Sequence, residues 1–453
     1  MIKKMNDCKI KLYRSATVGI ISKEFKLLCD PWLTDGEYYG SWSHYPPFDL
    51  DKNIDEINSY DAMYISHIHP DHCSEDTLKR ISKDIPVYIL SYHSKFLKFK
   101  IERLGFKVIE ISNFEKIQFT EDFSLSVIAA DNCDPELCYK FNGCADVNVS
   151  GESQQIDSLS LITCGNKNIL NINDCPYELA NSMLDKITDL YEIDCLLLGY
   201  GGAGPYPQCF DNLSLSEKAS KALDKKKKFL DMSIKYIEKI KPKYYLPFAG
   251  TYTLTGKLSK MQDLRGVPSL EETYNYLEKN FKQTNSQCIK LNPDASFSLH
   301  KLTYSELYKC IENREIKDYI DNILSKKKFD YENDEEVTFE ELLNLSNEAI
   351  KRFIKKKRDL KITLDTDVLL KFESKFIHID NNIDEILIKN NNDLLKIKKY
   401  VIYDVDPKLL KRILSGPRYA HWNNSEIGSH IKFFRHPDIF DRKVYNVMSY
   451  FHV

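Results

Sequence analysis

Residues 65–73 read Ile-Ser-His-Ile-His-Pro-Asp-His-Cys. The apolar run Asp61–Ser66 predicts a β-strand, and His67 and His69 lie two positions apart, on the same side of an extended segment. The side chains of metal-ligating type in this stretch are His67, His69, Asp71 and His72. Three of the 11 histidines of the chain lie here, which favours a metal site over a polar turn with incidental histidines.

Length and composition limit what the chain can be. A chain of 453 residues exceeds what one hydrophobic core usually organises, so we expect two domains. The formal net charge is -3, so nucleic-acid binding is not expected. The N-terminus has no apolar signal segment and no apolar run approaches the roughly 20 residues that cross a bilayer, so we expect a cytoplasmic protein without membrane partners. The 12 cysteines form no Cys-x-x-Cys pair, which favours reduced thiols and gives no sign of a zinc ribbon or a Rieske module.

Short apolar runs alternate with amphipathic stretches over roughly the first 300 residues. Strands are expected at Lys9–Tyr13, Thr17–Cys29, Asp61–Ser66, Pro86–Leu90, Lys107–Ile111, Ser124–Ala130, Leu159–Thr163, Asn168–Ile172, Asp194–Leu198 and Tyr244–Pro247. Helices are expected at Ser91–Leu104, Tyr177–Tyr191 and Leu213–Ile240. This alternation predicts a layered α/β domain.

The remainder of the chain follows a different pattern. Charged helices with Leu and Ile at helical spacing are expected up to about residue 358. Strand-like alternation follows at Lys361–Leu364 and Lys375–Ile379, and a helix is expected at Lys408–Leu414. We therefore expect a main domain at residues 1–302 and a C-terminal helical, α+β accessory domain at residues 303–453.

The pattern His-x-His-x-Asp-His after a strand resembles the metallo-β-lactamase superfamily, and Asp30-Pro31-Trp32 is similar to its lactonase and phospholipase-D-like branches. The resemblance implies an α/β fold, a metallo-β-lactamase αββα sandwich, for residues 1–302. The metal ligands it implies are His67 and His69 at site 1, Asp71 and His72 at site 2, and Asp174 as a bridge after the strand ending at Ile172.

Two positions depart from the family pattern. No histidine occurs between His93 and His300, where the family places a third ligand of site 1, and Asp131 at the end of a strand is the nearest substitute. The last histidine of site 2 is also missing, since the expected strand end reads Leu246-Pro247-Phe248-Ala249-Gly250. The resemblance therefore implies one or two metal ions in an altered ligand set.

Tyr64–Leu78, Leu170–Asp174 and Pro247–Gly250 resemble the catalytic region of cytidine monophosphate N-acetylneuraminate hydroxylases, over roughly residues 10 to 300. Members of that family use iron and oxygen on a nucleotide-activated sugar, with electrons from a Rieske module. Because this chain starts almost directly with its first strand, we expect any electron donor to be a separate protein.

Substrate contacts are expected from two further segments. Trp32, Trp42 and His44 belong to an aromatic loop that would overhang the metal in this fold, and aromatic faces suit a sugar or a nucleobase. Gly201 and Gly202 follow a strand, where glycine lets backbone N–H groups approach a ligand. Simple packing of the aromatic loop and an ordinary strand-to-helix connection are the alternatives.

Three functional hypotheses follow. The first is a metal-dependent, hydroxylase-like (monooxygenase) enzyme that modifies a small molecule, a sugar or nucleotide-sugar, with iron favoured. The second is a hydrolase of a phosphodiester or lactone that uses zinc or manganese. The third is a non-catalytic binding protein with a degenerate metal site. In the two enzyme hypotheses Asp71 is either a metal ligand or the catalytic proton acceptor.

Overall fold

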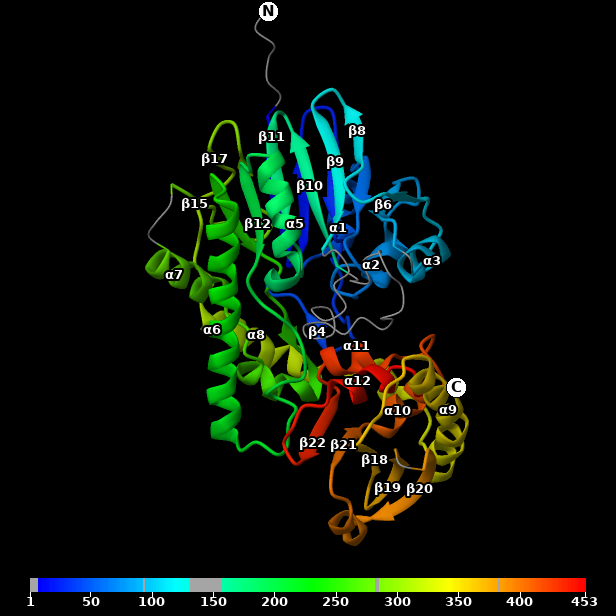
Figure 1. Cartoon of the computed structure of the whole chain (residues 1–453). Helices are drawn as coiled ribbons and strands as arrows, with labels where there is room; N and C mark the ends of the chain where they lie inside the picture. The colour runs from blue at the N-terminus through cyan, green and yellow to red at the C-terminus, as the bar shows by residue number, and fades with distance from the viewer. Residues whose placement is uncertain (1–6, 93, 131–156, 282–284, 382) are drawn as a thin grey trace, which may run out of the picture.

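The computed structural model describes residues 7–92, 94–130, 157–281, 285–381 and 383–453. Two large β-sheets stack in the upper body of Figure 1, and a smaller sheet forms a second body below them.

The first sheet has eight strands in the order β17-β16-β1-β2-β3-β5-β6-β7. Their bounds are β1 (Lys9–Arg14), β2 (Thr17–Ile21), β3 (Lys26–Cys29), β5 (Ala62–Tyr64), β6 (Val87–Leu90), β7 (Val108–Ile111), β16 (Ser296–Ser298) and β17 (Thr303–Tyr304). The expected strand Thr17–Cys29 is two strands, because the Ser22 hydroxyl accepts the backbone N–H groups of Glu24 and Phe25 and closes a turn. From β3 to β7 neighbouring strands run parallel, so their carboxyl ends share one edge.

The second sheet has seven strands in the order β15-β13-β12-β11-β10-β9-β8. Their bounds are β8 (Lys116–Thr120), β9 (Phe123–Ala129), β10 (Ser158–Cys164), β11 (Lys167–Asn171), β12 (Cys195–Gly199), β13 (Tyr244–Phe248) and β15 (Gln287–Cys288). Strands β11, β12 and β13 are parallel, so the segments after β11 and β12 emerge at the same edge.

Helices cover the outer face of each sheet. Those on the first sheet are α1 (Leu50–Asn58), α2 (Glu75–Arg80) and α3 (Phe96–Arg103), and those on the second are α5 (Tyr177–Leu190), α6 (Leu215–Ile240) and α7 (Leu270–Asn280). A separate apolar core lies between the sheets and includes Ile10, Leu27, Val127 and Leu197. This order of layers confirms the expected αββα sandwich.

The C-terminal part is built on a five-stranded sheet in the order β20-β19-β18-β21-β22. Its strands are β18 (Asp367–Phe372), β19 (Lys375–Asp380), β20 (Glu385–Asn390), β21 (Tyr400–Val405) and β22 (Ile431–His436). The helices from residue 313 onward are α8 (Asn313–Asn322), η2 (Leu324–Lys326), η3 (Asp330–Asn333), α9 (Phe339–Asp359), η4 (Asn391–Lys396), α10 (Pro407–Leu414), α11 (Trp422–Ile427) and α12 (Arg442–Met448). Two short strands, β4 (Trp42–Ser43) and β14 (Thr253–Leu254), and η1 (Gly256–Leu264) complete the described elements.

The expected strand at Lys361–Leu364 is wrong. Lys361 has a positive φ of 52°, and the N–H groups of Lys361 and Ile362 bond back to the carbonyls of Arg358 and Lys357. The segment therefore closes the end of α9, and the pairing strand begins later, at Asp367.

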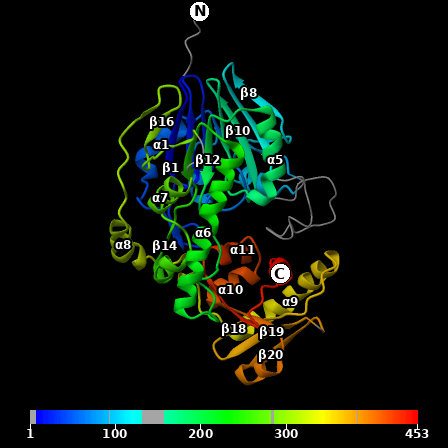
Figure 2. The same cartoon turned by 60° about the vertical axis from the view of Figure 1, so that its left-hand side comes forward.

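One apolar cluster crosses from the upper body to the C-terminal sheet. It contains Trp32, Trp42 and Phe210 from the first part of the chain and Trp422 and Phe433 from the last part. The rings of Phe210 and Phe433 stack at 5.1 Å, and the backbone N–H of Phe433 donates to the carbonyl of Cys209. In both views α10 and α11 lie between the five-stranded sheet and the upper body (Figure 1, Figure 2). The two parts of the chain therefore share a core, and the division near residue 302 stays a prediction.

We expect Phe433→Ala to destabilise the protein by about 3 kcal/mol, because it removes a buried ring from this shared cluster. Phe434→Ala is the matched control, because the ring of Phe434 lies on the other face of β22 from Phe433 and is only half-buried. Chemical denaturation followed by circular dichroism measures both variants. An equal, small effect of the two substitutions would contradict the shared core.

Candidate metal centre

The ligand-rich stretch forms a closed loop between β5 and α2. The backbone N–H groups of His72 and Cys73 both donate to the carbonyl of His69, at 3.0 and 2.8 Å. The hydroxyl of Ser74 accepts the N–H of Thr77 and caps α2. These bonds fix the turn that carries Asp71 and His72.

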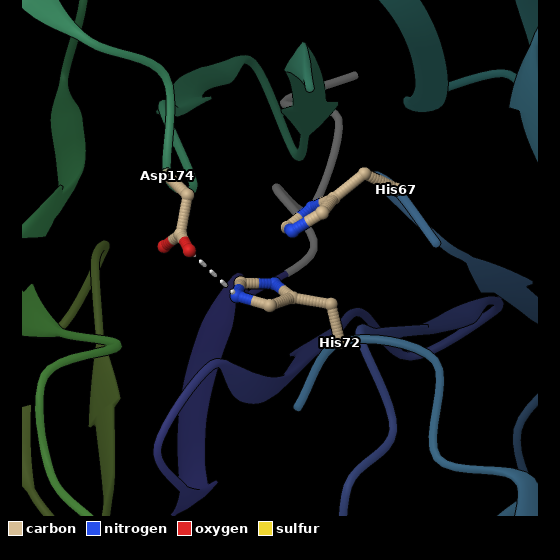
Figure 3. A group of neighbouring side chains, drawn as sticks. All are labelled: His67, His72 and Asp174. Atoms are coloured by element: carbon tan, nitrogen blue, oxygen red, sulfur yellow. Dashed lines mark ion pairs between the residues drawn. The ribbon is translucent and has the colours of Figure 1, made fainter. Parts of the chain in front are cut away.

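Five side chains that the sequence singled out converge at the edge of the two sheets. Nε2 of His67 lies 3.0 Å from Nδ1 of His69. Nε2 of His72 lies 3.4 Å from Oδ2 of Asp174 and 3.6 Å from Oδ2 of Asp71. Figure 3 shows Asp174 reaching this centre from the segment after β11, opposite the two histidines of the loop. The ligand atoms of His67, His72 and Asp174 lie within 4.8 Å of one another, a spacing that one metal ion could bridge.

In each of the three imidazoles, the ring nitrogen that faces away from the other two histidines contacts a neighbouring side chain. Nδ1 of His72 lies 2.9 Å from Oδ2 of Asp30. The Ser66 hydroxyl donates to Asp30, so it accepts the Nδ1–H of His67 at 2.9 Å. Nε2 of His69 lies 3.3 Å from the amide oxygen of Asn423 in α11. These partners leave Nε2 of His67 and Nδ1 of His69 as lone-pair nitrogens that face each other.

The contact between His67 and His69 and the carboxylates around His72 both favour a bound cation. Burial lowers the pKa values of His67 and His69, so both rings are neutral and their lone pairs would repel each other at 3.0 Å. Burial alone would lower the pKa of His72 too, but Asp174, Asp71 and Asp30 raise it well above its usual range. In the absence of metal a proton on Nε2 of His72 therefore takes the place of a cation beside Asp174. The donor set fits one or two divalent metal ions.

Asp71 also contacts Tyr38, a residue that the sequence did not single out for this role. The Tyr38 hydroxyl donates to Oδ1 of Asp71. Burial, and then the charge of Asp71, raise the pKa of Tyr38 well above its usual range, so the phenol keeps its proton. Burial likewise raises the pKa of Asp71. The pair offers a proton donor and a carboxylate at the centre, consistent with either role expected for Asp71.

Asp157 is a second site residue that sequence reasoning missed. It lies directly before β10, with Oδ1 at 3.5 Å from Nδ1 of His67. Burial and the nearby carboxylate of Asp174 raise the pKa of Asp157 to about 7. The expected substitute, Asp131, lies outside the described residues. An aspartate directly before β10 was the available signal, because β10 and β11 form one hairpin and Asp174 follows β11.

The position of the second missing histidine is filled by close packing. β13 ends at Phe248, Ala249 has a positive φ of 52°, and a Cβ on Gly250 would lie 2.4 Å from the ring of Tyr200. This segment offers no imidazole, and Asp174 and Asp71 are the carboxylates that face Nε2 of His72, at 3.4 and 3.6 Å.

The aromatic residues proposed for substrate contact are buried. Trp32, Trp42 and His44 are exposed by 0%, 2% and 2%, and the ring of His44 lies 4.0 Å from that of Trp32. Trp42 stacks on Tyr252 at 3.5 Å. The structure thus gives these three side chains a packing role, and substrate contact by them stays a prediction.

Packing also accounts for the two glycines after β12. A Cβ on Gly202 would lie 1.9 Å from the ring of Phe229, and one on Gly201 would lie 3.1 Å from the backbone of Gly250. The segment does emerge at the same edge as Asp174, because β11 and β12 are parallel. A ligand role for Gly201 and Gly202 stays a prediction.

Comparisons with known proteins agree with the expected resemblance. No family model matches the chain. Cytidine monophosphate-N-acetylneuraminic acid hydroxylase of Danio rerio is 30% identical over 247 residues, which cover 52% of this chain and 37% of the relative. About half of this chain is homologous to that hydroxylase. A protein of Mycolicibacterium smegmatis described as a Rieske 2Fe-2S iron-sulfur protein is 28% identical over 253 residues, 55% of this chain and 45% of the relative.

The chain spans less than half of the length of these two relatives. Among solved structures, CmlA, a diiron β-hydroxylase from Streptomyces venezuelae, superposes with a TM-score of 0.38 and 15% identity, over 65% of this chain and 53% of that chain. This superposition is loose, and the fold assignment rests on the strand order and the helix layers. None of the helices among the described residues is long and apolar enough to cross a membrane.

We expect His44 to make stability fall in mild acid. Burial lowers the pKa of His44 to about 3, so the folded state keeps this ring neutral while the unfolded chain takes up a proton below the ordinary value of 6.5. Between pH 7 and pH 5 this difference lowers the free energy of unfolding by about 2 kcal/mol. His44→Gln keeps a donor for the Trp32 carbonyl and should remove that part of the pH dependence. Denaturation curves at both pH values test it, and an unchanged slope in the variant would contradict the assignment.

We expect Asn423→Ala to weaken metal binding about tenfold to a hundredfold without unfolding the protein, because it removes the partner of His69 Nε2. Asn424→Ala is the matched control, since its side chain bonds to Tyr39 instead. Metal titration by calorimetry compares the two variants. Equal affinities would show that Asn423 does not position His69.

Proposed function

We propose that this chain is a metal-dependent enzyme of the hydroxylase type that modifies a small sugar-containing substrate, with a nucleotide-activated sugar as the favoured class. The observation that carries the metal requirement is the 3.0 Å approach of Nε2 of His67 to Nδ1 of His69, next to His72 and its two aspartates. The likeness to a hydroxylase that acts on a cytidine monophosphate sugar supports the reaction and substrate class.

The centre divides into two ligand groups. His67 and His69 would hold one ion, with Asp157 beside them, and His72, Asp71 and Asp174 would hold another. Mixed imidazole and carboxylate donors favour iron over zinc or manganese. When bound, iron supplies the redox chemistry that inserting an oxygen atom into a C–H bond requires.

Side chains of this chain can donate and accept protons at the centre, and one contacts it from the C-terminal part of the chain. The Tyr38 hydroxyl keeps its proton and donates it in a hydrogen bond to Asp71. The pKa of Asp157 is near neutrality, so its carboxylate can take up or release a proton at working pH. The amide oxygen of Asn423 in α11 contacts Nε2 of His69 at 3.3 Å and ties the C-terminal domain to the centre. The C-terminal domain is therefore part of the proposed active site.

Hydroxylation with dioxygen needs electrons from outside the substrate. One oxygen atom enters the substrate and the other leaves as water, which consumes two electrons and two protons. We propose that a separate electron-donor protein supplies the electrons, and the relative described as a Rieske iron-sulfur protein supports this class of donor.

The metal requirement is tested by elemental mass spectrometry on protein purified anaerobically without a metal-affinity column. We expect iron in the wild type and at least a tenfold loss of it in His67→Ala/His69→Ala. His436→Ala, an exposed histidine of β22, is the control and should retain the metal.

The reaction class is tested separately. Wild-type protein with iron, a chemical reductant and a cytidine monophosphate sugar should consume oxygen and give a product heavier by one oxygen atom. Bound zinc or manganese with hydrolysis of a phosphodiester would replace this proposal by the hydrolase hypothesis, and metal-free wild-type protein would overturn both.

A further inference from the structure

Two basic side chains meet where the long helix α6 passes the end of η1. Lys225 lies on α6, which extends below the second sheet toward the C-terminal sheet (Figure 1). Arg265 directly follows η1, and a Cβ on its neighbour Gly266 would lie 2.9 Å from both Cβ and Cδ of Lys225. The charge of Arg265 acts on Lys225, where burial first and this charge second lower the lysine pKa to about 7.

Neither cation has an acidic partner among the described residues. Nζ of Lys225 donates to the carbonyl of Tyr206 at 3.0 Å, which is a neutral acceptor. Arg265 is 7% exposed, donates to the carbonyl of Tyr252 and lies 4.5 Å from the centre of that ring. The charge of Asp263 acts on Arg265 without forming an ion pair with it. Buried cations are usually paired with anions, so this pair is suited to an anion that the chain itself does not supply.

A glycine-rich loop after β12 lies beside Lys225. A Cβ on Gly202 would lie 1.9 Å from the ring of Phe229, one turn of α6 after Lys225, so the loop packs on this face of the helix. Nothing lies within 4 Å of the corresponding position at Gly204, two residues before Tyr206. The loop is therefore open to a ligand at Gly204, where backbone N–H groups can add hydrogen bonds to a bound anion.

Packed rings connect Arg265 with the proposed metal centre. Tyr252, which carries the guanidinium, stacks on Trp42 at 3.5 Å. The ring of Trp42 lies 4.5 Å from that of Tyr38, whose hydroxyl donates to Asp71. The charge of Asp71 also acts directly on Tyr252. The basic pair thus lies near the proposed centre but apart from it, which suits a substrate whose charged group and reacting carbon are several bonds apart.

We propose that Lys225 and Arg265 bind the phosphate group of the substrate. Lys225 uses one of its three N–H donors on a carbonyl, and Arg265 uses two of its five on carbonyls, so both retain donors for phosphate oxygens. Charge-assisted bonds from lysine and arginine are the usual means of holding phosphate. The inference rests on the proposed function for the rest of the substrate, a nucleotide-activated sugar, but the phosphate contact itself needs no metal.

The first test compares ligands with and without phosphate. Binding of cytidine monophosphate, cytidine and inorganic phosphate to the full chain is measured by calorimetry, as purified and after removal of metal with a chelator. We expect cytidine monophosphate to bind in both states, at least tenfold more tightly than cytidine, and inorganic phosphate to compete with it. Equal binding of cytidine, or no binding of cytidine monophosphate to metal-free protein, would overturn the proposal. So would stronger competition by glucuronic acid, a sugar carboxylate, than by inorganic phosphate.

The second test removes one charge. Lys225→Met keeps the length of the side chain, so it should weaken the binding of cytidine monophosphate at least tenfold and leave that of cytidine unchanged. It should also raise Tm without ligand, because an unpaired, partly buried charge is removed. Lys227→Met is the matched control, since Lys227 is exposed on the opposite side of α6 and pairs with Asp231 at 2.7 Å. Wild-type affinity in Lys225→Met, or the same loss in both variants, would show that Lys225 does not bind the phosphate.

Oxygen consumption separates this inference from the proposed function. If the wild type consumes oxygen with a cytidine monophosphate sugar while Lys225→Met binds cytidine monophosphate normally, the proposed function stands and the phosphate site is wrong. If the two binding tests succeed and no oxygen is consumed, the phosphate site stands without the proposed reaction.

Discussion

The buried carboxylate of Asp30 is the constraint on which the proposed metal centre depends. It is fully buried at the end of β3, where its backbone takes a positive φ of 46°. One oxygen accepts the backbone N–H of Ser66 at 2.7 Å, and the other contacts the Ser66 hydroxyl and the His72 imidazole. A buried carboxylate is tolerated only when such bonds satisfy it. The same bonds join two parallel strands of the first sheet to the ligand loop, so the position of His72 is set by the sheet.

Charge balance then explains why so many carboxylates gather in one place. Asp30, Asp71 and Asp174 all contact His72, and Asp157 lies beside His67. Desolvation opposes the charge on Asp71, Asp157 and Asp174. A bound cation compensates it more effectively than a single imidazolium, because it interacts with several carboxylates and several lone pairs at once. This charge balance supports the proposed metal centre.

The C-terminal part of the chain contacts the proposed centre directly. Its α11 brings Asn423 to His69, and the backbone N–H of His421 donates to the Tyr39 hydroxyl at 2.7 Å. These polar contacts are held in place because the apolar cluster around Trp422 and Phe433 packs the C-terminal part of the chain against the aromatic loop. Trp32 and Trp42, which the sequence favours as substrate contacts, are buried in the apolar cluster that joins the two parts of the chain.

The sequence by itself determined the layered α/β fold, most strand positions and five of the side chains that converge at the proposed centre, because each of these is a local pattern. His67, His69, Asp71 and His72 lie in one turn after a strand, and Asp174 follows a strand whose end is visible in the periodicity. Only the tertiary structure decided the roles of Tyr38, Asp157 and Asn423. Asn423 is 354 positions from His69 in the chain, and a local sequence pattern cannot predict a contact that depends on how distant parts of the chain pack together. The same holds for the burial of Trp42 and for the packing of Gly266 against Lys225, since burial and contact depend on neighbours supplied by other elements of the fold.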